Sequence, residues 1–205
     1  MDQAVAAVIE EYEVRARREQ ELSATLSADE AMRRRDEMLL PVGHAAGTLI
    51  NLLIKEAGAR RILEVGSSYG YSTTWLAEAA AAVDGRVVSL ELQRAKTEYA
   101  TQQLARAGLA GRVDFRVGDA LASLAALDGP FDFVLIDLWK DLYVPVFELL
   151  YPKLAPGALV VADNMLHPES ARAHARAYRE RVRAAREMSS VLLEVGNGLE
   201  VSRFR

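Results

Sequence analysis

Residues 62–73 read ILEVGSSYGYST, a short apolar run that meets a cluster of small residues and two tyrosines. The apolar run is typical of a buried β-strand, and the small residues after it predict a tight turn into a helix. Two explanations of this turn compete. Its glycines either close a strand-to-helix connection, or they keep the backbone low so that a ligand can lie against it.

Short apolar runs alternate with helical patterns over the rest of the chain. This alternation predicts a parallel sheet with helices on both faces, and the continuous runs FVLI and LVV are typical of fully buried parallel strands. The predicted strands are residues 61–65, 86–92, 112–117, 131–137 and 158–163, and the predicted helices between them are residues 71–83, 94–107, 120–127 and 142–153.

The C-terminal part follows a different pattern. Residues 169–188 predict a basic helix, and residues 190–205 predict two short strands around the turn Gly196-Asn197-Gly198. We therefore expect an α/β fold with a doubly wound, Rossmann-like sheet of seven strands. The sheet is mostly parallel and ends in an antiparallel C-terminal hairpin.

The N-terminal part is predicted to be helical. Residues 2–22 and 47–58 have apolar residues at helical spacing, and Ser27 with Glu30 has the spacing of a helix N-cap. We expect residues 1–205 to form a single domain in which residues 1–57 are a helical cap segment. The apolar stripe of the first helix predicts either a homodimer interface or packing on the chain's own sheet.

Composition excludes several classes of protein. The 205 residues are 51% hydrophobic and carry a net charge of −4, which indicates a globular protein without the basic footprint of a nucleic-acid binder. Because the chain has no cysteine, it has no disulfide, thiolate nucleophile or Cys-ligated zinc. We see no secretory signal and no apolar run near the roughly 18 residues of a membrane span, so we expect a soluble, cytoplasmic protein without a membrane partner.

Polar residues are concentrated where the predicted strands end. In the common strand order 3-2-1-4-5, ligands bind at the carboxyl ends of the strands, at the point where the order reverses. The residues at these ends are Gly66, Glu91, Asp119, Asp137 and the pair Asp163-Asn164, with Glu64 inside the first strand.

These residues indicate which chemical groups the ligand carries. The turn Gly66-Ser67-Ser68-Tyr69-Gly70 lacks the G-x-G-x-x-G pattern of a dinucleotide site. Glu91 can accept hydrogen bonds from both hydroxyls of a ribose. Glu64 would repel a pyrophosphate and attract a cationic amine. A ligand with a ribose, an ammonium group and no pyrophosphate is expected, and S-adenosylmethionine (SAM) fits that description.

A series of motifs resembles a known family. ILEVGSSYGYST, VVSLEL, VGDA, FDFVLIDLWKDLY and LVVADNML look like the motifs of class I SAM-dependent O-methyltransferases. More narrowly, they are similar to the cation-dependent family that includes catechol and caffeoyl-coenzyme A O-methyltransferases. The resemblance runs from about residue 40 to the C-terminus, and the pairing of Asp-x-x-Lys-Asp with a later Asp-Asn is its most specific part.

The resemblance implies a role for particular residues. Asp137, Asp163 and Asn164 match the family's metal ligands, an oxygen set suited to Mg²⁺ first, with Ca²⁺ or Mn²⁺ as alternatives. Lys140 matches the catalytic lysine, which acts as a base. The residues implied in binding the methyl donor are Val42, Glu64, Gly66, Ser67, Gly70, Tyr71, Ser72, Glu91, Asp119, Ala120, Asp137 and Trp139.

The expected function is methyl transfer from SAM to a hydroxyl of a catechol-like small molecule. Two alternatives stay open: a nicotinamide-dependent oxidoreductase on the same fold class, and a binding module that keeps the fold without the chemistry. The chain also departs from the catechol branch, because Ser190 or Val191 stands where those enzymes have a glutamate that contacts the second ring hydroxyl. The acceptor and the position methylated therefore stay open.

Overall fold

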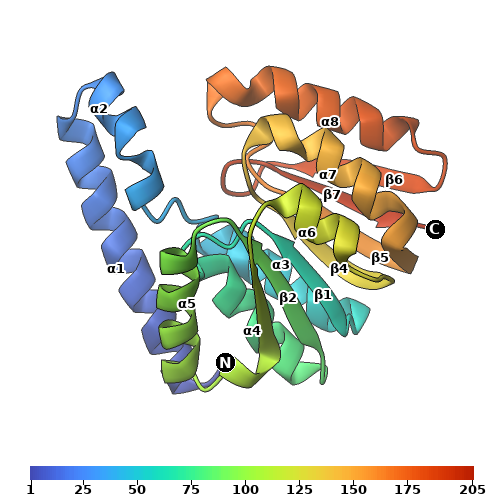
Figure 1. Cartoon of the computed structure of the whole chain (residues 1–205), viewed down its shortest axis with the longest axis horizontal. Coiled ribbons are helices and arrows are strands. Elements are labelled where there is room, and N and C mark those ends of the chain that lie inside the picture. The colour runs from blue at the N-terminus through green and yellow to red at the C-terminus, as the bar shows by residue number, and fades with distance from the viewer.

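The computed structural model describes the backbone of residues 1–205 and the side chains of all of them except Ala28, Ala31 and Met32. Its centre is a seven-stranded sheet in the order β3-β2-β1-β4-β5-β7-β6 (Figure 1). The strands are β1 (Arg61–Val65), β2 (Arg86–Glu91), β3 (Val113–Val117), β4 (Phe131–Ile136), β5 (Leu154–Ala162), β6 (Met188–Leu193) and β7 (Leu199–Phe204).

The sheet confirms the predicted topology. β1 pairs in parallel with β2 and β4, β2 with β3, and β4 with β5, so the first five strands have the predicted order 3-2-1-4-5. β7 then pairs antiparallel with both β5 and β6, which gives the expected C-terminal hairpin. Strand order reverses between β1 and β4, so the carboxyl ends of these two strands form the rim where a ligand is expected.

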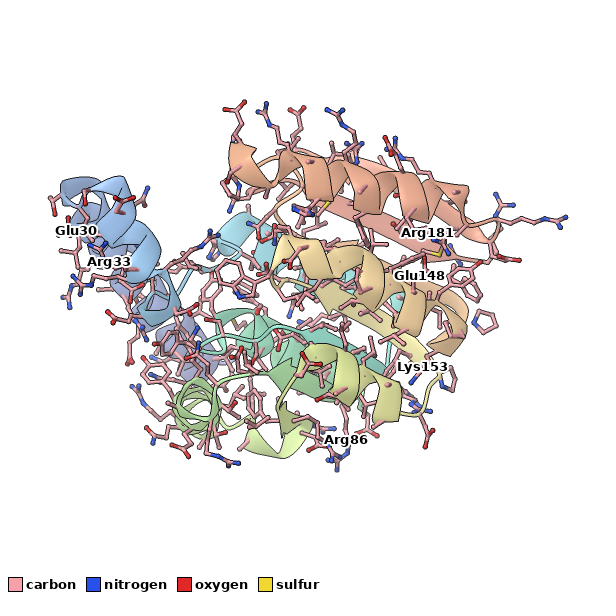
Figure 2. The ribbon with its side chains drawn as sticks, turned by 45° about the horizontal axis from the view of Figure 1, so that its top comes forward. Glu30, Arg33, Arg86, Glu148, Lys153 and Arg181 are labelled. Carbon is pink, nitrogen blue, oxygen red and sulfur yellow. The ribbon has the colours of Figure 1, made fainter. Side chains whose placement is uncertain are left out.

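Helices cover both faces of the sheet (Figure 1). α3, α4 and α5 lie over one face with α1 packed on them, and α6, α7 and α8 lie over the other, each side having its own apolar cluster. Glu148 of α7 and Arg181 of α8 form an ion pair, and Figure 2 labels both. The helices are α1 (Gln3–Thr25), α2 (Ala28–Arg33), α3 (His44–Ala57), α4 (Tyr71–Ala82), α5 (Arg94–Arg106), α6 (Ala120–Ala126), α7 (Tyr143–Leu150) and α8 (Arg172–Ala184).

The N-terminal helices form as predicted and pack on the same chain. The stripe on α1 that includes Val8 and Tyr12 is buried against α4 and α5. The apolar face for which a homodimer interface was one of the two expectations is therefore covered by the chain itself. Ser27 and Glu30 form a reciprocal cap: the Glu30 amide donates to Ser27 Oγ at 3.3 Å, and the Ser27 amide donates to Glu30 Oε2 at 3.1 Å. None of the described helices combines the length and the apolar character that crossing a bilayer requires.

Several boundaries differ from the prediction, and α1 ends at Thr25 and α3 begins at His44, each three residues from its predicted bound. β5 begins at Leu154, four residues early, because the strand continues through Pro156 and Gly157 at a register shift against β4. The predicted helix 142–153 is α7 followed by the short 3₁₀ turn η4, Tyr151–Lys153, which contains Pro152. The predicted helix 169–188 begins with the 3₁₀ turn η5, Glu169–Ala171, and its helical part ends at Ala184.

Candidate active site

A cavity of about 820 Å³ opens at the carboxyl ends of β1, β2 and β4. The turn after β1 forms one wall, and the segment between α2 and α3 forms another. The predicted site residues that line it are Val42, Gly66, Ser67, Tyr71, Ser72, Glu91, Asp119, Ala120, Asp137, Trp139, Lys140 and Asn164. The structure thus brings together residues that are up to 122 positions apart in the sequence.

Glycine allows the turn after β1 to pass close to its neighbours. Gly66 has φ +97°, and a Cβ at this position would lie 2.1 Å from the carbonyl oxygen of Asp137. The amides of Gly66 and Ser67 both donate to the carbonyl of Leu90, at 3.0 and 3.2 Å. Ser67 Oγ is buried and has no hydrogen-bond partner among the described residues. A buried, unpaired hydroxyl in a cavity wall is costly, so this turn fits a ligand that would satisfy it.

Glu91, at the end of β2, is held in place by the backbone. The amide of Ser68 donates to its Oε2 and the amide of Gln93 to its Oε1, both at 2.9 Å. Each carboxylate oxygen has a further lone pair that these bonds do not use, and Glu91 lines the cavity. The side chain can therefore accept two further hydrogen bonds from a diol such as a ribose.

Three of the residues predicted to bind the cofactor make structural contacts within the chain. Glu64 is fully buried in β1 behind Ser72, whose Oγ donates to Glu64 Oε1 at 2.6 Å, and it does not line the cavity. Gly70 likewise lies outside the lining and packs on α5, where a Cβ would come within 2.6 Å of Ala100 Cβ. Asp119 lines the cavity but also caps α6, because its Oδ1 accepts the amide of Ala122 at 2.8 Å. Direct contact of Glu64 and Gly70 with a cofactor stays a prediction.

Lys140 lies among the predicted metal ligands. Its Nζ is 2.8 Å from Asn164 Oδ1 and 3.5 Å from Asp137 Oδ1, so the two oxygens that come from neighbouring strand ends converge on one point. Asn164 has φ +57°, a conformation that asparagine tolerates better than most residues. Tyr143, which the sequence analysis did not single out, accepts from Lys140 Nζ at 2.5 Å. It is fully buried and fixes the lysine at this point.

The charges at this point are unbalanced. Burial raises the pKa of Asp137, and burial together with repulsion from Asp137 raises the pKa of Asp163 well above its ordinary value. Burial also lowers the pKa of Lys140, although both carboxylates attract its proton. When all three groups are ionised, two carboxylates are paired with one ammonium, so the site has an excess negative charge that a bound cation would offset.

A divalent cation fits the residues present. Asp163 is 1% exposed, and neither of its carboxylate oxygens has a hydrogen-bond partner among the described residues. Asp137, Asp163 and Asn164 offer two carboxylates and an amide oxygen, the donors that hard cations prefer. Among the described side chains no cluster of three or more His, Asp or Glu is placed to hold a metal, so water and substrate oxygens would complete the coordination.

The opposite wall contains residues that the sequence analysis did not find. Arg35, Met38 and Leu40 line the cavity from the segment between α2 and α3, opposite Trp139. Trp139 is 50% exposed, so it forms a wall of the cavity and is not part of the core. At the Glu91 end, Lys96 of α5 is buried, with Nζ 5.3 Å from the ring centroid of Tyr69. Only their position in the fold identifies these residues.

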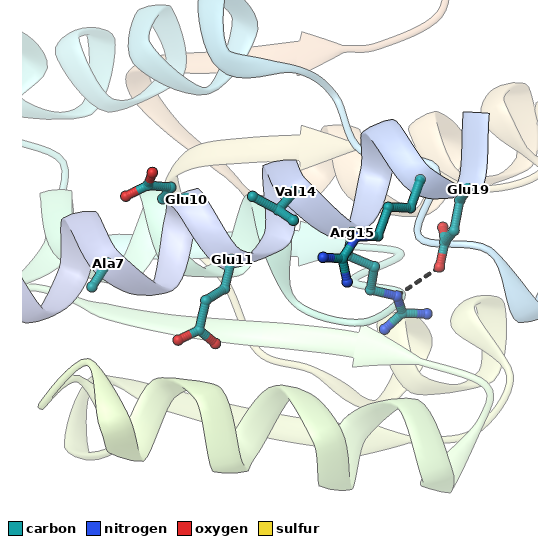
Figure 3. Close-up of a pocket in the computed structure, with 7 residues that line it drawn as sticks. Ala7, Glu10, Glu11, Val14, Arg15 and Glu19 are labelled. Atoms are coloured by element: carbon teal, nitrogen blue, oxygen red, sulfur yellow. Dashed lines mark hydrogen bonds and ion pairs between the residues drawn. The ribbon is translucent and has the colours of Figure 1, made fainter. Parts of the chain in front are cut away.

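A smaller hollow of about 500 Å³ lies along α1 (Figure 3). All its lining residues belong to this one helix, from Ala7 to Glu19, and Arg15 and Glu19 form an ion pair at 2.6 Å across one turn. No strand end reaches it. Because the polar strand ends gather in the larger cavity, that cavity is the candidate active site.

The chain matches a family model described as O-methyltransferase over residues 13–203. A catechol O-methyltransferase from Mycobacterium tuberculosis is 40% identical over 146 residues, which are 71% of this chain and 64% of that protein. A catechol O-methyltransferase from Niastella koreensis is 34% identical over 147 residues, 70% of this chain and 66% of that protein. The match therefore spans a little less than two thirds of the length of each relative.

A solved structure agrees with these matches. The O-methyltransferase from Bacillus cereus in complex with SAH has a TM-score of 0.76 and 29% sequence identity, and the superposition covers 95% of this chain and 100% of that chain. The family predicted from the motif series is thus confirmed by the family model and by similarity of fold. The chain belongs to the O-methyltransferase family.

Proposed function

We propose that the protein transfers a methyl group from SAM to a hydroxyl of a catechol-like small molecule, with the help of a divalent cation. One observation carries the proposal. The convergent oxygens of Asp137 and Asn164, with Lys140 between them, line the same cavity as the Gly66 turn and Glu91. The names of the relatives from Mycobacterium tuberculosis and Niastella koreensis support catechol as the acceptor class.

The donor would lie along the turn after β1. The two free lone pairs of Glu91 suit the ribose hydroxyls, and the unpaired Ser67 Oγ suits the polar methionine end of the molecule. Asp119 and Ala120 line the cavity as Glu91 does, and in this proposal they would contact the adenine. Holding donor and acceptor in one cavity supplies much of the rate enhancement of a two-substrate reaction, because the entropy of bringing them together is lost on binding.

The acceptor would lie between Trp139 and the oxygens of Asp137, Asp163 and Asn164, which would hold the cation. A bound divalent cation stabilises the phenolate form of a coordinated hydroxyl. Lys140 lies beside these oxygens, and its pKa is lowered by burial, so its neutral amine can accept the phenolic proton. Tyr143 holds Lys140 in position.

A methylation assay with radiolabelled SAM and catechol tests the proposal. We expect activity with Mg²⁺, loss of activity with EDTA, and a decrease of about 10²–10⁴-fold in kcat for Lys140→Met, because general-base catalysis contributes on that scale. Lys55→Met is the matched control, since Lys55 of α3 pairs with Glu78 of α4 and does not line the cavity. Full activity of Lys140→Met would refute the role of the base, and full activity in EDTA would refute the role of the cation.

Calorimetry separates this function from the oxidoreductase alternative. SAM and its product SAH are expected to bind, and NADH is not, because the turn lacks the glycine pattern of a dinucleotide site. Binding of NADH in preference to SAM would refute the proposal. Binding of SAM without methylation of any diphenol would favour the alternative of a non-catalytic module.

A further inference from the structure

Arg35 is a cation at the acceptor end of the cavity. It lies in the 3₁₀ turn η1, Arg35–Glu37, and its guanidinium carbon is 5.1 Å from the ring centroid of Trp139. The neighbouring Arg34 pairs with Glu37, whereas Arg35 makes no ion pair with any side chain that the structure describes. Arg35 is half-buried and lines the cavity, so a ligand at this end would lie near its positive charge.

Arg35 lies close to the reacting end. Trp139, whose ring the guanidinium faces, is the residue next to Lys140 and is two residues from Asp137. Two acids also line this side. Glu19 already accepts from Arg15 and from the amide of Leu39, both at 2.6 Å, and Asp36 is exposed to solvent. Arg35 therefore remains available to an incoming anion.

The residues around Arg35 suit an aromatic ring. Trp139 and Leu40 are both about half exposed, at 50% and 51%, although large apolar side chains usually favour burial. Leu40 also lines the cavity, and its φ of +46° is a strained backbone conformation for leucine. A planar ring bound here would cover both side chains and would leave its substituent near Arg35.

We infer that Arg35 binds a carboxylate on the methyl acceptor, so that the preferred acceptor is an acidic diphenol and not a neutral one. This inference rests on the function proposed above. A guanidinium held against an aromatic face is pre-organised, and its planar fork matches a carboxylate. A doubly charged phosphate would require a second cation. Lys140, the other basic side chain described at this end, is already hydrogen-bonded to Asn164 and Tyr143.

Two pairs of acceptors test the inference: 3,4-dihydroxybenzoate with 3,4-dihydroxybenzamide, and 3-(3,4-dihydroxyphenyl)propanoate with its amide. Within each pair, the two acceptors share the diol and nearly the same shape, but only the acid is charged. The two pairs place this charge at different distances from the ring. The readout is the ratio of kcat/KM for the acid to that for the amide. For at least one pair we expect Arg35→Gln to decrease this ratio by about 10–100-fold, mainly through KM for the acid, since charge-assisted pairs are strong. The kcat/KM for the amide should change less than the kcat/KM for the acid, because the amide has no charge for Arg35 to bind.

Two further variants serve as controls. Arg33→Gln removes the same charge from an exposed position of α2 that does not line the cavity, and Figure 2 shows Arg33 on this outlying helix. This variant should keep the wild-type ratio. Arg35→Lys keeps the charge without the planar fork, so its ratio should lie between those of the wild type and Arg35→Gln.

The possible failures can be told apart. If Arg35→Gln decreases kcat/KM equally for acid and amide in both pairs, Arg35 only shapes the loop and the inference is wrong. If the wild type methylates both acids and amides, but Arg35→Gln leaves the acid-to-amide ratio of kcat/KM unchanged, the inference is also wrong. The proposed function then still stands. If none of the four diphenols is methylated, the proposed function itself fails, and the inference fails with it.

Discussion

Glu64 shows how one buried acid connects the fold to the site. It is fully buried in β1 and accepts three hydroxyl hydrogen bonds of 2.6 Å each, from Ser72, Thr73 and Ser89. Two of these donors belong to the first turn of α4, and Ser72 also lines the cavity. Glu64 therefore fixes the cavity wall from behind, which is a positioning role.

The pKa of Glu64 predicts how stability depends on pH. Burial raises it from 4.5 to about 7 in the folded state, although the three hydroxyls lower it. Between these two pH values the folded protein holds a proton that the unfolded chain has released. The contribution of Glu64 to the free energy of unfolding should therefore be most favourable below pH 4.5 and should decrease as the pH rises through 7, by on the order of 3 kcal/mol.

Urea unfolding of the wild type and of Glu64→Gln at pH 5, 6, 7 and 8 measures this contribution. Glutamine does not titrate, so the other groups cancel in the difference between the two proteins. The stability of the wild type relative to the variant should decrease from pH 5 to pH 7 and stay level above it. Parallel pH profiles would show that Glu64 titrates near its ordinary pKa.

The turn between β1 and α4 depends on close packing between elements. Gly70 has φ +92° at the N-cap of α4, and a Cβ there would lie 2.6 Å from Ala100 Cβ on α5. Tyr12 of α1 donates to the carbonyl of the adjacent Tyr69 at 2.6 Å. Three helices therefore meet at this turn, and its glycine serves helix packing as well as turn geometry.

Gly70→Ala should be more destabilising than an alanine at an open glycine. Both the left-handed backbone and the clash with Ala100 are unfavourable, and together they should lower the free energy of unfolding by about 2–5 kcal/mol. Gly108→Ala is the matched control, because Gly108 has φ +71° and an added Cβ there would meet nothing within 4 Å, so only the backbone term of about 1–2 kcal/mol applies. Equal losses in urea unfolding would show that α5 moves aside without cost.

The sequence predicted the elements well where a local pattern decides them. The alternation of strands and helices, the Ser27–Glu30 cap and the hairpin at Gly196–Gly198 are all present. The start of β5 was missed, because Pro156-Gly157 has the local signature of a turn, whereas the first residue of the strand, Leu154, pairs with Phe131 of β4 on the far side of a register shift. Secondary-structure propensity depends on the local sequence, so it does not include the effect of pairing with a neighbouring strand.

The site was predicted in part for the same reason. Residues at strand ends, such as Glu91, Asp137 and Asn164, are found from topology because parallel strands share one rim. Arg35 and Lys96 carry no such signal, since an arginine in a run of charges and a lysine in a helix are ordinary surface patterns. Their place in the cavity follows from how the helical segments pack on the sheet.

At the scale of the whole molecule, the site lies at the edge of both apolar clusters. Val65 and Ile136 belong to one cluster and Leu135 to the other, and their strands end at the cavity. Asp163 directly follows β5, does not itself line the cavity, and has two buried oxygens without hydrogen-bond partners among the described residues. Folding thus gathers carboxylates that disfavour one another, and a cation that binds only the folded state should stabilise the whole protein.

Thermal unfolding with Mg²⁺ or EDTA tests this linkage without any substrate. At a Mg²⁺ concentration ten times the Kd, the folded state should gain about 1.4 kcal/mol, which corresponds to a rise in Tm of roughly 3–6 °C for a chain of this size. Asp163→Asn should lose this response, and without metal it should be at least as stable as the wild type, because it removes a buried acid that is repelled by Asp137. Asp114→Asn, at an exposed acid paired with Arg116 on β3, should keep the response. An equal rise in Tm for both variants would mean that Mg²⁺ acts on surface charge and not at the strand ends.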